Sequence, residues 1–277
     1  NIEMIKALRN FMSRRTISAK ARNHIMNTFS SYELFQKIRS ETESSRQAAN
    51  RPHEVLYFHK VDDPYSHLTI QCLEQLKSSY EITLKFILVG EENLDAVHEA
   101  SLYNIYCLQD VNRIAPFYNI DFQAHEYPAK ELVEKANSIL TAVKSDDLIE
   151  IANKVSSAMW EGDIGTLDKL SSTYFATKAE VKENLIQGNK IRDAKGYYFG
   201  SAFYYEKELY WGVDRLPYLE ERLADLGAKK VHETENICPL ELKAPKQFTS
   251  DKKVNLYYYP SLNSPYTFVS TKRVRQM

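Results

Sequence analysis

The stretch HKVDDPYSHL, residues 59–68, decides the fold predicted for this chain of 277 residues. It follows VLYFH (55–59), a short apolar run with the length and composition of a buried parallel strand. A helix is expected from Pro64, because proline is favoured at the first helical position. Asp62 or Asp63 then provides the N-cap, a position that favours aspartate. The sequence therefore predicts a strand, a capped turn and a helix.

The segments that follow complete a sheet. ITLKFILV (82–89) predicts a second strand, so that strand, helix and strand form a βαβ unit. Residues 92–192 have helical patterns without a strand signal, and residues 196–213 predict a hairpin. A last helix is expected to begin with Asp214 as its N-cap and to stop at Gly227. This order predicts an α/β fold, a thioredoxin-like sheet with a large all-helical insertion.

Composition narrows the class of protein. The net charge of -1 argues against a nucleic-acid binder. The sequence contains no run of 18 apolar residues, so no membrane-spanning helix is expected. Three scattered thiols suit a reducing compartment and no secretory signal is seen, so a cytoplasmic location is expected. The seven histidines lack ligand spacing, so no metal site is expected. The absence of a C-x-x-C pair argues against a dithiol oxidoreductase, and three thiols are expected as buried small hydrophobes: Cys72, Cys107 and Cys238.

The expected domain, residues 53–227, is flanked by other segments. Residues 1–52 predict an amphipathic helical arm, whose first 25 residues carry six basic side chains and one acidic side chain. Either the arm packs on the body or on another subunit of a homo-oligomer, or it meets an anionic partner or membrane surface. Residues 228–252 are polar, contain two prolines and predict a linker.

The end of the chain repeats the opening motif. In NLYYYPSLNSPYTFV (255–269), the run Ser264-Pro265-Tyr266-Thr267 matches Asp63-Pro64-Tyr65-Ser66. Residues 253–277 are thus expected to start a second, incomplete copy, with a first strand and the beginning of a helix. We expect the chain to be part of a longer tandem protein.

Three motifs carry a resemblance to a known family. VLYFHKVDDPYSHL resembles the first strand and S-P-Y-S turn of the 2-hydroxychromene-2-carboxylate isomerases. AMWEGDIGTLDKL (158–170) is similar to their F-x-x-G-x-D-I stretch, and FGSAFYYEKELYWGVDRLPYLEERL (199–223) to their G-x-D-R-L ending. These enzymes belong with the kappa-class glutathione transferases in the DsbA-like branch of the thioredoxin fold. The resemblance covers roughly residues 53–227.

The resemblance implies a glutathione site at the N-terminus of the first helix, formed with Pro64 and Tyr65. A serine there contacts the thiolate, which the helix N-terminus also stabilises. Here that serine is replaced by Asp63, whose carboxylate would repel a thiolate by several kcal/mol at about 4 Å. The family's cis-proline is replaced by Ser201, where a trans peptide is expected because a non-proline cis bond costs about 3 kcal/mol. The aspartate that binds the γ-glutamyl amine is retained as Asp214.

Two functions stay open. The first is a thiol-binding isomerase or glutathione transferase acting on a small molecule, with Asp63 as acid or base and Trp160 or Asp163 nearby. Ser264 in the second copy is then the better candidate for the thiol-contacting serine. The second function is a catalytically degenerate domain with a binding or scaffolding role. A pocket over Asp63 lined by Asp214 favours the first function, and a filled turn favours the second.

Overall fold

The computed structural model falls into two compact units, Asn1–Ala49 with Pro245–Met277, and Asn50–Ala244. The residues that the structure describes are 24–25, 27–28, 31–91, 97, 99–144, 147–230, 235–238, 255, 257–261 and 265–276.

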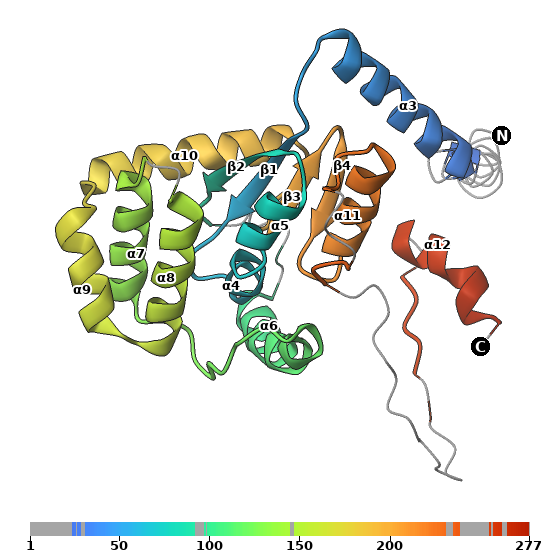
Figure 1. Cartoon of the computed structure of the whole chain (residues 1–277). Coiled ribbons are helices and arrows are strands. Elements are labelled where there is room, and N and C mark those ends of the chain that lie inside the picture. The colour runs from blue at the N-terminus through green and yellow to red at the C-terminus, as the bar shows by residue number, and fades with distance from the viewer. Residues whose placement is uncertain are drawn as a thin grey trace, which may run out of the picture. The chain divides into compact units, whose positions relative to one another are not determined.

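The larger unit is built on a four-stranded sheet in the order β2-β1-β3-β4 (Figure 1). Strand β1 pairs with β2 in parallel and with β3 in antiparallel direction, and β3 and β4 form an antiparallel hairpin. This order and these directions are those of a thioredoxin-like sheet, so the predicted fold class is confirmed. The strands are β1 (Glu54–His59), β2 (Thr83–Leu88), β3 (Ala202–Tyr205) and β4 (Glu208–Trp211).

Alternation along β1 sends side chains into two apolar layers. Val55 and Tyr57 belong to the main core, beneath the helices that follow β1. Leu56 and Phe58 belong to a smaller cluster with Val89 on the opposite face of the sheet. Both faces of β1 are covered, so its successive side chains are apolar on either side. This explains the continuous apolar run in the sequence.

The predicted helix after β1 is two helices, α4 (Pro64–Ile70) and α5 (Leu73–Ser79). The chain turns at Gln71 and Cys72, where the Cys72 N–H donates to the Thr69 carbonyl at 3.0 Å. The Gln71 side chain donates to the carbonyl of Asp121 and accepts from the Asp121 N–H. A single continuous helix was therefore a wrong prediction, because a contact with a distant loop holds the break.

The described part of the insertion between β2 and β3 consists of helices joined by loops and has no strand, which confirms the prediction of a helical insertion. Helices α7, α8 and α9 pack on one another, α8 also contacts α4, and α10 contacts β2 (Figure 1). The elements are α6 (Ala100–Ile114), the short 3-10 helix η3 (Ala115–Tyr118), α7 (Lys130–Ala142), α8 (Leu148–Glu161), α9 (Ile164–Thr173) and α10 (Lys178–Ala194). A thioredoxin-like sheet with this insertion is the DsbA-like variant of the fold.

The last helix of the unit, α11 (Leu216–Asp225), starts later than expected. Its N-cap is Arg215, and the Arg215 N–H donates to the Gly212 carbonyl at 3.3 Å across a tight turn. Asp214 lies inside this turn, so its predicted role as the N-cap was wrong. Gly227 adopts a φ of 74° just after the helix, and its predicted role as the stop signal is confirmed.

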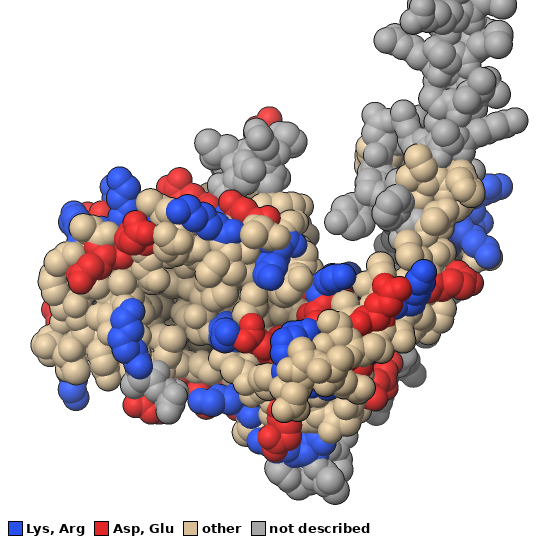
Figure 2. All heavy atoms as spheres, turned by 90° about the horizontal axis from the view of Figure 1, so that it is seen from above, with Lys and Arg blue, Asp and Glu red and all other residues tan. Residues whose placement is uncertain are grey.

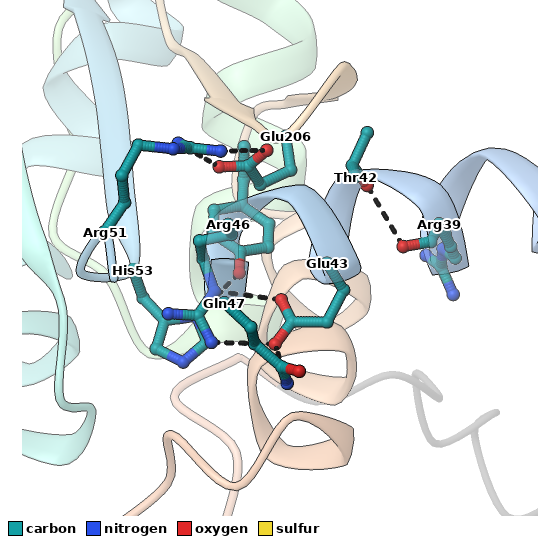
Figure 3. Close-up of polar contacts among 9 residues, drawn as sticks. Arg39, Thr42, Glu43, Arg46, Gln47, Arg51, His53 and Glu206 are labelled. Atoms are coloured by element: carbon teal, nitrogen blue, oxygen red, sulfur yellow. Dashed lines mark hydrogen bonds and ion pairs between the residues drawn. The ribbon is translucent and has the colours of Figure 1, made fainter. Parts of the chain in front are cut away.

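An ion pair joins the turn between β3 and β4 to the chain just before β1. Glu206 and Lys207 both have positive φ, 42° and 72°, as a two-residue turn between twisted strands requires. Arg51, which precedes β1, donates to the Glu206 carboxylate at 2.7 and 3.3 Å (Figure 3). The start of the domain is thereby attached to its hairpin.

The smaller unit contains helix α3 (Tyr32–Ala48), capped by the Ser31 hydroxyl. Within this helix, the Glu43 carboxylate accepts hydrogen bonds from Arg46 and Gln47, both at 2.7 Å (Figure 3). Near the C-terminus, helix α12 (Pro265–Val274) is present, whereas residues 255 and 257–261 form no strand. The strand expected for a second copy is thus absent from the described residues, because a single strand has no sheet edge to pair with.

Candidate functional site: the turn after β1 and the cavity beside it

The turn after β1 is capped by the side chain of Asp63. One carboxylate oxygen accepts the Tyr65 N–H at 3.2 Å, and the other accepts the Ser66 N–H at 3.0 Å. The second oxygen also accepts the Ser66 hydroxyl at 2.7 Å. These N–H groups are the ones that an anion would use at a helix N-terminus. Because both N–H groups already donate to the Asp63 carboxylate, they are not available to a bound anion.

The loop before β3 lies directly on this turn. A Cβ placed on Gly200 would be 2.8 Å from the Lys60 Cβ, 2.9 Å from the Ser66 Oγ and 3.0 Å from an oxygen of Asp63. The next residue, Ser201, is fully buried, and its Oγ lies 2.7 Å from the Thr69 Oγ1. No described peptide bond is cis, as expected for serine at the family's cis-proline position. The Gly200 backbone therefore packs directly on the turn, where the Asp63 side chain is half-buried, and we call this arrangement the filled turn.

Aromatic rings pack around the start of α4. The rings of Tyr65 and Trp211 lie 5.3 Å apart, and Phe199 stacks on Trp211 at 5.4 Å. The Tyr65 hydroxyl donates to the Asp110 carboxylate at 2.8 Å, and burial with this hydrogen bond raises the pKa of Tyr65 well above its ordinary value. Tyr65 is a neutral, fixed donor rather than an exposed acid.

Of the other predicted site residues, Asp62 precedes Asp63 in the turn, Asp163 and Asp214 come from other parts of the domain, and Ser264 is not described. Asp214 faces Arg215, with 3.7 Å between its carboxylate and the guanidinium, and burial raises the pKa of Asp214 above its usual range. Asp62 lies beside Lys60, whose ammonium is 3.0 Å from its carboxylate. Asp163 caps α9 by accepting the Thr166 N–H and hydroxyl. Ser264 lies outside the described residues, so its predicted role stays a prediction.

Trp160 lines a small hollow of about 390 Å³ together with His67 and Gln71, at the end of α4, and Phe122. Its ring stacks on His67 at 6.1 Å and meets Phe122 edge-on at 5.3 Å. The His67 Nδ1 lies 2.8 Å from the Ser156 Oγ, and burial lowers the pKa of His67 to about 4. This arrangement places Trp160 in a packed aromatic cluster, separate from Asp63.

A larger cavity of about 990 Å³ opens at the carboxyl ends of β1 and β2. Ligands of open α/β sheets bind at this end of the strands. Sequence reasoning missed this cavity. Its apolar lining comes from the two strand ends and from α7 and α10: Val61, Val89, Val133, Val181, Leu185 and Ile186.

The charges around the larger cavity are mixed. Lys60 pairs with Asp62 at the rim, and Lys178 pairs with Glu134 at 3.3 Å. Across the face shown in Figure 2, Lys and Arg side chains are interspersed with Asp and Glu side chains over the described surface. This distribution agrees with the net charge of -1.

Other expected features concern metals, thiols and membranes. Within the described residues, no cluster of three or more His, Cys, Asp or Glu side chains has the geometry to hold a metal ion. None of the described helices combines the length and apolarity needed to cross a bilayer. All three cysteines are buried, as expected.

The strand order and the insertion define a thioredoxin-like, DsbA-like protein. No family model matches the chain, and no curated protein matches its sequence. Among solved structures, it is similar to a selenomethionine 2-hydroxychromene-2-carboxylate isomerase, at 19% identity and a TM-score of 0.48 over 63% of this chain and 96% of that chain. It is also similar to a candidate protein disulfide isomerase from Nitrosomonas europaea, at 14% identity and a TM-score of 0.47 over the same shares of each chain. The fold assignment rests on the sheet topology rather than on these similarities.

Proposed function

We propose that this domain is a binding domain that keeps the DsbA-like fold without its thiol chemistry. The observation that carries the proposal is the filled turn, in which Asp63 accepts three hydrogen bonds at the start of α4. The isomerase or glutathione-transferase chemistry implied by the resemblance needs that place for a thiolate sulfur. A thiolate there would meet the Asp63 carboxylate and the backbone of Gly200.

The proposed ligand is a small, mainly apolar molecule held in the cavity at the ends of β1 and β2. A volume of about 990 Å³ lies at the upper end of the range for small-molecule sites. Val181 and Leu185 present an apolar wall, whereas rim charges such as those of Lys178 and Glu134 pair with each other. This combination favours a ligand without net charge, since a charged ligand would have to compete with existing ion pairs. A cytoplasmic location and a homo-oligomer remain part of the proposal.

The test is a fluorescence titration with N-phenyl-1-naphthylamine, a neutral apolar probe that emits strongly only when shielded from water. We expect saturable binding to the whole chain, and an affinity at least about tenfold lower for Val181→Trp, because an indole would project into the cavity from its apolar wall. Ile164→Trp is the matched control, since it adds the same ring on exposed α9 outside this lining. Equal binding by both variants, or no binding by the wild type, would contradict the proposal.

A further inference from the structure

Two of the three buried cysteines lie against each other, although 166 positions separate them in the sequence. The Sγ atoms of Cys72 and Cys238 are 3.9 Å apart. Cys72 sits at the break between α4 and α5, and Cys238 ends the described segment 235–238. Cys107 is buried elsewhere, near Tyr65 and Tyr103.

The segment that carries Cys238 is attached to the domain by specific contacts. The Ile237 N–H donates to both carboxylate oxygens of Glu220, at 3.0 and 3.2 Å. Glu220, on α11, also accepts the Tyr80 hydroxyl at 3.2 Å. The contact between the two sulfurs is therefore part of a defined docking site for the segment that leaves the domain.

We propose that Cys72 and Cys238 form a reversible disulfide that fastens segment 235–238 to the domain. To form the bond, the two sulfurs must approach each other from 3.9 Å to about 2.05 Å. The bond would link the exit of the domain to the break between α4 and α5. It would hold the start of the linker in place even if the hydrogen bonds to Glu220 opened.

A peroxide is the proposed oxidant. One thiolate attacks a peroxide oxygen, the O–O bond breaks, and a sulfenic acid forms with release of one water. The second sulfur then attacks the sulfenic sulfur and displaces its hydroxyl as a second water. The two thiols lose two hydrogens and are oxidised, and hydrogen peroxide is reduced to two waters.

The surroundings of Cys72 and Cys238 slow their oxidation and protect the disulfide once it has formed. The neighbouring Cys72 and burial raise the pKa of Cys238 well above its ordinary value, so little thiolate is present at neutral pH. Both side chains are nearly inaccessible, with 4% of Cys72 and none of Cys238 exposed. Oxidation therefore runs through transient release of segment 235–238, and the closed disulfide is shielded from small thiols.

The test is to expose the folded whole chain to excess hydrogen peroxide, denature it, and count free thiols with N-ethylmaleimide by mass spectrometry. We expect one adduct in place of three, a loss of two hydrogens, and a peptide that joins Cys72 to Cys238. We also expect the melting temperature to rise by roughly 10 °C on oxidation and to return with dithiothreitol. Three adducts after oxidation, or a link that involves Cys107, would overturn the proposal.

Cysteine variants show whether the rise in melting temperature comes from the disulfide or from another effect of the oxidant. In Cys72→Ser and in Cys238→Ser, the rise in melting temperature on oxidation should vanish. In Cys107→Ala, the rise should remain. The adduct count on the wild type decides the question even if a variant fails to fold, because it needs no substitution.

Discussion

Replacing Gly188 by alanine should lower the free energy of unfolding by more than about 3 kcal/mol. Gly188 lies within α10 and faces the last residue of β2. A Cβ at this position would be 1.9 Å from the carbonyl oxygen of Leu88 and 3.0 Å from its carbonyl carbon. The clash is with backbone, which cannot rotate away, so α10 would have to leave the sheet.

Urea unfolding at pH 7 measures this effect, and a decrease of 3 kcal/mol corresponds to roughly 6–12 °C in melting temperature. Gly165→Ala is the matched control in α9, because its Cβ would meet only the Asp163 carboxylate at 3.5 Å. There the better helix propensity of alanine should raise stability by up to about 1 kcal/mol. Equal stability of Gly188→Ala and the wild type would mean that α10 does not pack on β2 in this way.

Acid should destabilise the domain well above the pH at which most carboxylates titrate. His59 is fully buried, its Nε2 has no hydrogen-bond partner, and burial lowers its pKa to about 3. Burial likewise lowers the pKa of His67 to about 4. In the unfolded chain both would take up a proton below about pH 6.5. Their contribution to stability is thus complete above pH 6.5 and is lost as the pH falls toward 4.

The two histidines together should account for a loss on the order of 6 kcal/mol between pH 7 and pH 4. Glu220 and Asp214 act in the opposite direction, because burial raises the pKa of each carboxyl and protonation then favours the folded state. A variant comparison isolates the histidine term. His59→Phe should lose roughly 3 kcal/mol less than the wild type over this interval.

The measurement is the free energy of unfolding in urea at several pH values from 7 to 4. His125→Gln is the control, because it removes an imidazole from an exposed position instead of from the core. If His59→Phe shows the same acid loss as the wild type, the neutral buried histidine is not a source of that loss.

Local patterns in the sequence were sufficient for the sheet. The apolar run of β1 and the hairpin near Glu206 depend on neighbouring residues, and both were predicted within a few positions. The break at Gln71 depends on hydrogen bonds to Asp121, a loop that no local pattern connects to it. The start of α11 at Leu216 was missed because a tight turn at Gly212 comes first.

The candidate site shows the same limit. The sequence offered Asp62 or Asp63 as the cap of α4, since aspartate is favoured before the first turn, and the structure assigns the cap to Asp63. That the turn is filled depends on Gly200, which only the β1–β3 pairing brings to Asp63. The cavity at the strand ends depends on how α7 and α10 pack, so its lining could be read only from the structure.

The most direct test of the central claim is a calorimetric titration of the whole chain with reduced glutathione. Because the turn is filled, we expect no saturable binding of glutathione at millimolar concentration. The protein sample used must melt cooperatively and must still bind the apolar probe. Saturable binding by the wild type that Asp214→Ala abolishes would contradict the claim, since it would show an open thiol site of the kind implied by the resemblance.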